Sequence, residues 1–234
     1  MRIDIWSDVV CPWCFIGKRR LEAALSTFEH ADEVEVVWHS FQLDPGAPTQ
    51  PTESTSVMLA RKYGRSAEGA REMQDQVTSA AAEDGLAFRL SETLHVNTLD
   101  AHRLIHLALH RGGPELQGAV KEALLSAYFI EARNVADLDV LREAATSAGL
   151  DGAEVDRVLA SDEHAEDVVA DIERARSLGA NGVPFFVIDN AFGVSGAQPA
   201  DAFSQVLERA WQQSHPALQL DGDGDACGPD GCAV

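Results

Sequence analysis

Hydrophobic and polar residues alternate at the start of the chain and then give way to a helical repeat. Residues 2–6 alternate and lead into the apolar pair Val9 and Val10, a pattern that predicts a short strand. Residues 33–41 are rich in β-branched and aromatic side chains and are followed by a Pro-Gly turn, which predicts a second strand. Between them, apolar residues recur at helical spacing: Phe15, Leu21, Ala24, Leu25 and Phe28. We therefore expect a β-α-β unit whose strands are parallel and joined by a right-handed crossover.

The middle of the chain has a different character. From residue 52 to residue 178 the sequence is rich in Ala, Glu and Arg with helical periodicity, which predicts a block of about five or six helices. Asp137 and Asp151 have the character of N-caps, and Pro114 suits the first turn of a helix. Only residues 86–90 interrupt the helical pattern, and we expect them to form an extended connector.

Strand character returns toward the end of the chain. Residues 183–189 and 191–196, on either side of Asn190, predict a β-hairpin. A final helix is expected over residues 199–213, with one apolar face: Phe203, Val206, Leu207, Ala210 and Trp211. The predicted order is β-α-β, a helical block, then β-β-α, which is an α/β fold with a large all-helical insertion. We assign residues 1–50 and 179–215 to one domain, residues 51–178 to the inserted helical domain, and residues 216–234 to an acidic tail that we expect to be flexible.

The composition is that of an acidic globular protein. With 45% hydrophobic residues, a chain of 234 residues can bury a substantial core. The formal net charge of -20 repels phosphate backbones and anionic lipids, so neither nucleic acid nor a membrane is an expected partner. No apolar run reaches the roughly 18 residues of a membrane span, and the chain opens without the basic and apolar regions of a signal peptide. These features predict a cytoplasmic protein.

Cys11 and Cys14 form a CxxC pair at the predicted junction of the first strand and the first helix. Unpaired backbone amides and the helix dipole stabilise a thiolate at the start of a helix, so Cys11 is the candidate nucleophile. Pro12 suits the first helical turn, and Cys14, one turn further on, is placed to resolve a mixed disulfide formed at Cys11. The pair predicts thiol-disulfide exchange.

A second cysteine pair, Cys227 and Cys232, lies in the Gly- and Asp-rich tail with a turn-forming spacer. One hypothesis is an auxiliary redox pair that exchanges with Cys11 and Cys14, and the alternative is an exposed, adventitious disulfide. Four thiolates could also bind zinc, but the two pairs occupy unrelated sequence contexts, so we expect no metal site.

The Cys11-Pro12-Trp13-Cys14 motif follows the first predicted strand, and Val183-Pro184 precedes the third, with the helical block between them. In this arrangement the chain resembles the DsbA family of thioredoxin-fold thiol-disulfide oxidoreductases, and within it the cytoplasmic FrnE-like branch. The likeness extends to residue 213 and also rests on three further segments: Asn97–Arg103, Asn181–Phe186 and Ser195–Gln198. The resemblance implies a thioredoxin-like fold that carries the helical insertion.

The resemblance also implies the layout of a substrate site. It implies a cis Val183–Pro184 peptide bond that faces the nucleophile, so that the backbone of Val183 offers an edge to an extended peptide. Without the resemblance, Pro184 would be interpreted as an ordinary proline at the start of a strand. The other candidate substrate-binding residues are Pro12 and Trp13 beside the thiols, and Asn97, Thr98 and His102 on the face of the insertion above them.

The function expected from these residues is protein thiol-disulfide oxidoreduction or isomerisation, with protein or peptide thiols and disulfides as substrates. No cofactor is expected besides the redox-active disulfide, with glutathione open as a co-substrate, and we expect a monomer or a homodimer. DsbA-type oxidants have histidine where this chain has Trp13, which supplies no positive charge. We therefore predict a less oxidising pair, suited to reduction or isomerisation.

Two other functions stay open at this point. Kappa-class glutathione transferases and glutathione-dependent 2-hydroxychromene-2-carboxylate isomerases look similar in architecture. They typically present a serine at the nucleophile position and lack the second thiol, so Cys14 argues against this alternative. A peptide-binding or chaperone module without catalysis would leave the dithiol unexplained.

Three further features each have two interpretations. The run Lys18-Arg19-Arg20 either adds positive potential near the thiols or is a solvated helix face. Asp8 either moves protons at the pair or caps a turn. His102, His106 and His110 share one helical face, a spacing that suits a metal, but hydrogen-bonded or solvent-facing roles are more common and we favour them.

Overall fold

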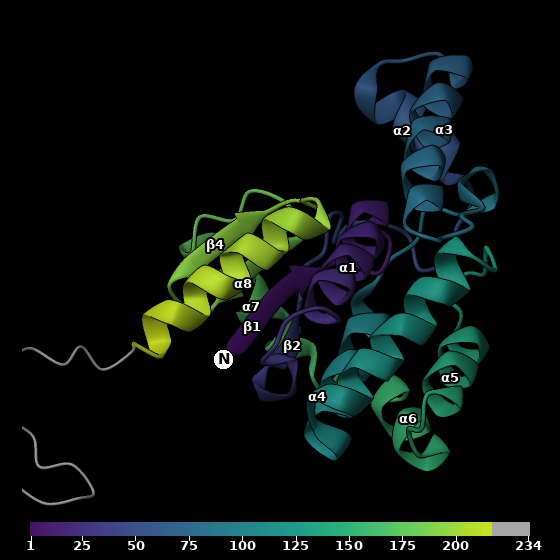
Figure 1. Cartoon of the computed structure of the whole chain (residues 1–234). Coiled ribbons are helices and arrows are strands. Elements are labelled where there is room, and N and C mark those ends of the chain that lie inside the picture. The colour runs from purple at the N-terminus through teal and green to yellow at the C-terminus, as the bar shows by residue number, and fades with distance from the viewer. Residues whose placement is uncertain (217–234) are drawn as a thin grey trace, which may run out of the picture.

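Four strands form one mixed sheet within residues 1–216, the part of the chain that the computed structural model describes (Figure 1). The strands are β1, Arg2–Ser7; β2, Glu35–Ser40; β3, Phe185–Ile188; and β4, Phe192–Ser195. Their order in the sheet is β2-β1-β3-β4. β1 and β2 are parallel, whereas β3 runs antiparallel to both of its neighbours. The parallel pair and the final hairpin are therefore as predicted.

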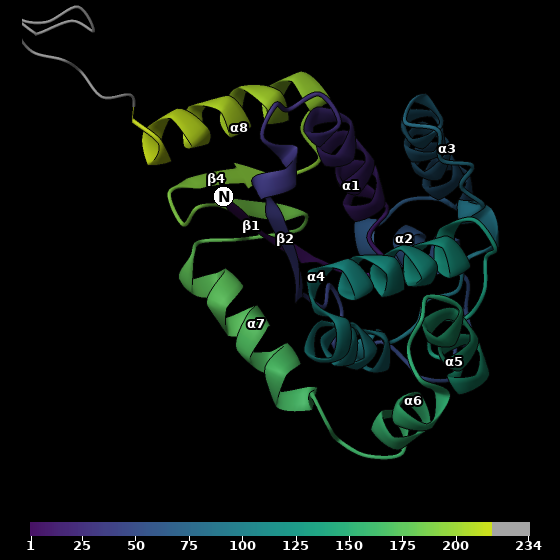
Figure 2. The same ribbon diagram turned by 60° about the horizontal axis from the view of Figure 1, so that its bottom comes forward.

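Helices cover both faces of this sheet (Figure 2). α1, Pro12–Leu25, and α8, Ala200–Ser214, pack on each other on one side. α4, Leu99–Phe129, and α7, Ala165–Ser177, contact β2 from the other side. Because α1 connects the parallel strands β1 and β2, its first turn begins at the edge of the sheet where β1 ends.

The remaining helices lie outside these layers. α2, Thr55–Tyr63, and α3, Ala67–Glu83, form a hairpin that projects beyond the sheet (Figure 1). α5, Leu138–Ser147, and α6, Gly152–Leu159, pack on α4. The stretch between β2 and β3, all of it described, thus contains six helices, in agreement with the prediction.

Several helix boundaries match the sequence signals. Gly113 has a φ of 68°, a left-handed conformation that favours glycine, and it interrupts α4 so that Pro114 opens the second half of the helix. The carboxylates of Asp137 and Asp151 each accept backbone amide hydrogen bonds at the starts of α5 and α6, so both are the predicted N-caps. Residues 86–89 form the connector and lead into a short 3-10 turn at Leu90–Glu92.

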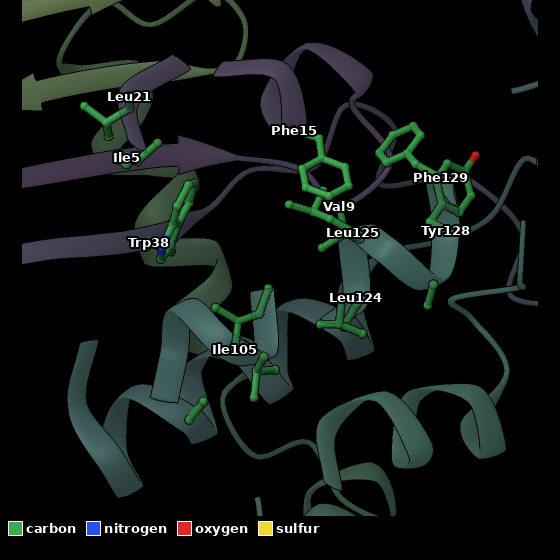
Figure 3. Close-up of a cluster of buried hydrophobic side chains, with 14 of the residues drawn as sticks. Ile5, Val9, Phe15, Leu21, Trp38, Ile105, Leu124, Leu125, Tyr128 and Phe129 are labelled. Carbon is green, nitrogen blue, oxygen red and sulfur yellow. The ribbon is translucent and has the colours of Figure 1, made fainter. Parts of the chain in front are cut away.

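One hydrophobic core joins the sheet to the helical segment (Figure 3). Phe15 of α1 is fully buried, and its ring lies 5.8 Å from that of Phe88 and 6.2 Å from that of Phe129 on α4. The rings of Phe88 and Phe129 stack 4.8 Å apart. Burying a large apolar side chain contributes about 1.5–3 kcal/mol. These rings therefore hold the first turn of α1 firmly against α4.

A buried ionic cluster fastens α7 to the sheet. His39 on β2 lies 2.7 Å from Asp4 on β1 through Nε2 and 2.7 Å from Asp171 on α7 through Nδ1. Although burial opposes the charge, these two carboxylates raise the pKa of His39. Burial also opposes the charge of Asp4, but hydrogen bonds from His39 and Arg2 lower the pKa of Asp4 to about 2. Burial also opposes the charge of Asp171, but hydrogen bonds from His106 and His39 lower its pKa, so both carboxylates of the cluster are charged at neutral pH.

The fold is the predicted α/β arrangement, a β-α-β unit and a β-β-α unit around a helical insertion. α7 falls within residues 51–178 and yet packs against β2; the domain boundaries themselves stay a prediction. Within residues 1–216, none of the helices combines the length and the apolar character needed to span a membrane. The predicted auxiliary pair, Cys227 and Cys232, lies outside the described residues.

Candidate active site

The CxxC pair lies at the start of α1. Cys11 has an extended backbone, with φ of -94° and ψ of 111°, and Pro12 is the first helical residue. Proline fits this position because the amide that it lacks would have no partner within the helix. The backbone amide of Cys14 donates to the carbonyl oxygen of Cys11 over 3.0 Å, which closes the first turn. Both thiols are free and on the same turn, as the spacing requires for exchange.

The two cysteines differ in environment. Cys11 is 4% exposed, whereas Cys14 is 1% exposed and lies beneath it. Burial, together with a hydrogen bond to Cys11 and the negative charge there, raises the pKa of Cys14 well above its usual range. Cys14 is therefore a neutral thiol when the pair is reduced, which leaves Cys11 as the group that reacts first.

The loop that precedes β3 faces Cys11. The Val183–Pro184 peptide bond is cis, and the Sγ of Cys11 lies 3.6 Å from the carbonyl oxygen of Val183. Gly17 allows this approach, because a Cβ at that position would lie 3.1 Å from Cγ of Pro184 and 3.2 Å from Cζ of Phe186. The structure thus brings the predicted residues Val183 and Pro184 together with the dithiol.

A cavity of about 340 Å³ opens beside the dithiol, between the start of α1 and the helices α2, α3 and α4. Cys11, Pro12, Trp13 and Val183 line one side, and Trp13 is 41% exposed. The opposite wall is largely apolar and comes from α2, α3 and α4: Met58, Leu59, Tyr63, Met73, Val77, Tyr128 and Phe129. A substrate thiol or disulfide carried by an apolar segment fits this setting.

Of the three residues implied above the thiols, Thr98 lines this cavity, whereas Asn97 and His102 are not part of its lining. Asn97 instead donates to the carbonyl oxygens of Pro45 and Ala47 over 3.0 and 3.1 Å and so fixes the loop after β2. The cavity wall also includes His95, which the sequence analysis did not single out.

His102 lies below the cavity and contacts Asp8, which does line it. The Nε2 of His102 is 3.2 Å from Oδ1 of Asp8, and both residues are 1% exposed. Burial lowers the pKa of His102, so its ring is neutral and donates to the carboxylate. Burial alone would raise the pKa of Asp8, but this hydrogen bond and another from the amide of Leu43, at 2.8 Å, bring it below its usual value. Asp8 is thus a buried carboxylate that a neutral histidine orients.

The basic run after the motif is neutralised locally. Lys18 is only 7% exposed, so the interpretation as a solvated face is wrong for it, and its ammonium pairs with Glu22 and with Glu122, the latter at 2.7 Å. Arg19 pairs with the same two carboxylates. Arg20 pairs with Asp84 at 2.8 Å. The run therefore adds no unpaired positive charge beside the dithiol.

The histidines of α4 take different partners. His102 contacts Asp8, and His106 lies 3.0 Å from Asp171. His110 is exposed and its ring stacks on that of His164 at 4.9 Å. His102 and His106 are thus buried and paired with carboxylates, whereas His110 lies at the surface beside His164 and Asp167.

The sequence analysis missed Lys121, a buried lysine of α4 whose Nζ lies 5.7 Å from the centre of the Trp38 ring on β2. It lies at helical spacing from Gln117 and Leu124, both of which are fully buried. A lysine on the core-facing side of an amphipathic helix was the available signal. Its contact with Trp38 was not visible in the sequence, because the two residues are far apart along the chain.

Comparisons with known proteins agree with this geometry. A model of the DSBA-like thioredoxin domain matches residues 2–208. The crystal structure of a probable DsbA oxidoreductase from Streptomyces coelicolor is 48% identical, with a TM-score of 0.86, over 100% of this chain and 99% of that chain. An uncharacterized protein of Bacillus subtilis, YwbO, is 27% identical over 212 residues, which are 88% of this chain and 96% of that protein. The cytosolic disulfide reductase DsbM from Pseudomonas aeruginosa, solved with GSH, is 19% identical with a TM-score of 0.61, covering 91% of this chain and 100% of that chain, a similarity of fold alone.

Proposed function

Because this chain belongs to the DSBA-like thioredoxin domain family, we propose that it is a cytoplasmic thiol-disulfide oxidoreductase that acts on protein or peptide substrates through Cys11 and Cys14. The observation that carries the proposal is the free dithiol at the start of α1, with Cys11 at 3.6 Å from the Val183 carbonyl oxygen on the edge of an apolar cavity. Within the described residues no disulfide staples the fold, which suits a reducing compartment. The FrnE-like branch is the part of the family that we propose for it.

The proposed reaction proceeds through a mixed disulfide. The thiolate of Cys11 attacks one sulfur of a substrate disulfide, and the other substrate sulfur leaves and takes up a proton. Cys14 then loses its proton and attacks the Sγ of Cys11, which releases the second substrate thiol and leaves a Cys11–Cys14 disulfide. Two electrons pass from the dithiol to the substrate. The reverse sequence oxidises a substrate dithiol.

The residues around the cavity support a role in binding an extended chain. The half-buried backbone of Val183 lies beside Cys11, and we propose that it pairs with substrate backbone while Pro12, Trp13 and Thr98 contact side chains. Asn97 supports this site indirectly by holding the loop after β2. His102 supports it by orienting the carboxylate of Asp8. Glutathione is a candidate co-substrate that returns the disulfide to the dithiol.

The direction that we propose is reduction or isomerisation. Trp13 places no charge beside Cys11, and the nearby basic run is already paired with carboxylates. Less stabilisation of the thiolate makes a less oxidising pair. A reduction potential as oxidising as that of DsbA itself would contradict this part of the proposal.

The test compares insulin reduction and the refolding of scrambled ribonuclease by the wild type, Cys11→Ser and Cys14→Ser. We expect Cys11→Ser to be inactive, and Cys14→Ser to accumulate a mixed disulfide at Cys11 that is visible on a non-reducing gel. Insulin reduction that survives in Cys11→Ser would refute the mechanism. Glutathione conjugation that depends on Cys11 and not on Cys14 would instead favour the glutathione-dependent enzymes.

A further inference from the structure

The contact between α4 and α7 ends at the surface in a cluster of three side chains that can bind a metal ion. They are His110 of α4, His164 at the N-cap of α7, and Asp167 in the first turn of α7. One ligand atom from each of the three lies within 4.8 Å of the other two. None of these residues lines the cavity beside the dithiol, so the cluster is a separate feature of the molecule.

The cluster continues a row of histidine–carboxylate pairs between α4 and α7, which lie on the same face of the sheet (Figure 2). In the buried part of this row, His106 of α4 lies 3.0 Å from Asp171 of α7. One turn away on each helix, toward the surface, the same residue types recur as His110 and Asp167. The ring of His164 stacks on both histidines of α4, at 6.2 Å from His106 and 4.9 Å from His110. Two histidines and a carboxylate therefore meet where the row reaches solvent.

The backbone that carries His164 is held in place from α4. Arg103 is only 4% exposed, and its Nε donates to the carbonyl oxygen of Glu163 over 2.7 Å. The same guanidinium also donates to the carbonyl oxygens of Val158 and Ser161. His164 itself has a φ of 66°, a left-handed conformation that disfavours residues other than glycine. These hydrogen bonds fix the loop before α7, so the position of the His164 ring is set before any ligand binds.

The two cluster residues of α7 already point toward each other. Nδ1 of His164 donates to Oδ2 of Asp167 over 2.7 Å, and the side chain of His164 is only 11% exposed. The positive end of the helix dipole opposes a cation here, but it amounts to about half an elementary charge. Glu166 and Asp167 place two carboxylates in the same turn, which outweigh it. The local charge therefore favours a bound cation.

The donor set favours zinc over calcium or magnesium. Imidazole nitrogens suit zinc and its neighbours in the first transition row, whereas calcium and magnesium take oxygen ligands. Zinc is often bound by two histidines and a carboxylate, with water in the fourth tetrahedral position. Ligand atoms around tetrahedral zinc lie about 3.4 Å apart, so the three side chains must close by no more than about 1.4 Å. His110 is exposed, and rotation of its side chain can close this gap.

We propose that His110, His164 and Asp167 form a zinc site that joins α4 to α7. The bound ion links the two helices at the surface, one turn away from the buried pair of His106 and Asp171. No metal site was expected from the sequence, because the three ligands come from two helices that are far apart along the chain. The inference does not depend on the thiol chemistry proposed for Cys11 and Cys14, and the two can fail separately.

The test is a calorimetric titration of the full chain with zinc chloride. Every sample carries serine in place of all four cysteines, because thiolates also bind zinc. His110→Asn and His164→Asn each remove one ligand, and asparagine tolerates the left-handed backbone at position 164. His30→Asn is the matched control, since His30 also has a carboxylate three residues further on, Glu33, at 3.8 Å.

We expect the parent chain to bind one zinc ion, and each ligand variant to bind it at least about tenfold more weakly. Loss of a residue that only orients a ligand already costs about 10–100-fold in metal affinity. His30→Asn should bind zinc as the parent does, and magnesium should not replace zinc. Zinc should also raise the unfolding temperature of the parent but not that of His110→Asn, because only a folded chain brings the ligands together.

Two results would overturn the proposal. One is a parent chain that binds no zinc. The other is an unchanged zinc affinity in His110→Asn, which would assign the ion to other carboxylates of this acidic chain. His110 is exposed, so its replacement should leave the fold intact and keep this comparison decisive even if His164→Asn does not fold.

Discussion

Gly17 lies where α1 passes closest to the loop that faces the dithiol, and we expect Gly17→Ala to push the two apart. The added Cβ would lie 3.1 Å from Cγ of Pro184 and 3.2 Å from Cζ of Phe186, both shorter than ordinary van der Waals contact. Neither neighbour yields easily. Pro184 is buried, and the Phe186 ring is fully buried and packs edge-on against Phe203 at 4.7 Å.

Two opposing effects decide the magnitude. Alanine in place of glycine within a helix stabilises by about 0.5–1 kcal/mol. Overpacking a tight interior costs about 1–3 kcal/mol. Gly118 in α4 separates the two effects, because a Cβ there would meet only Nε1 of Trp38 at 3.9 Å. We therefore expect Gly118→Ala to raise the free energy of unfolding and Gly17→Ala to lower it, with a difference of about 1–3 kcal/mol between them.

The assay is urea unfolding of the wild type and both variants, followed by tryptophan fluorescence, with insulin reduction measured in parallel. Because the loop carrying Pro184 also carries the carbonyl oxygen that contacts Cys11, Gly17→Ala should slow insulin reduction while Gly118→Ala should not. Equal stabilisation by the two substitutions would refute the reasoning, since it would mean that the loop moves away from α1 without cost.

Three other expected results concern the titration of buried groups and the redox chemistry of the cysteines. The free energy of unfolding, measured by urea titration, should fall below about pH 4, because Asp4 and Asp171 take up protons more readily in the unfolded chain than in the folded protein. It should fall again as the pH rises through the raised pKa of His39, and this second decline should vanish in His39→Asn. Trp13→His places a positive charge beside the thiolate and should favour the reduced pair about tenfold in glutathione equilibrium, whereas an unchanged equilibrium would show that this position does not set the potential. Replacing Cys227 and Cys232 together by serine should slow reduction of the active-site disulfide by an electron donor, and unchanged turnover would argue against exchange between the pairs.

Most strands and helices of the fold could be predicted from the sequence, because local sequence signals specify them. Alternation over residues 2–6 and the β-branched run at 33–41 became the parallel strands β1 and β2, and the carboxylates of Asp137 and Asp151 became the predicted N-caps. Such signals act over a few residues and do not depend on distant contacts. The packing of α7 on β2 was not visible in this way, because it depends on the pairing of His39 with Asp171, residues far apart in the sequence.

The site shows the same division. The spacing of Cys11 and Cys14 and the proline between them determined by themselves that a dithiol would open a helix, since a helix start and a one-turn separation are local properties. Tertiary structure decided which side chains surround that dithiol. It placed Thr98 on the cavity and Asn97 away from it, and it buried Lys121 of α4 against the ring of Trp38 on β2. A buried charge is tolerated only where opposite charge lies close in space, and that closeness is set by how helices and sheet pack rather than by the order of residues.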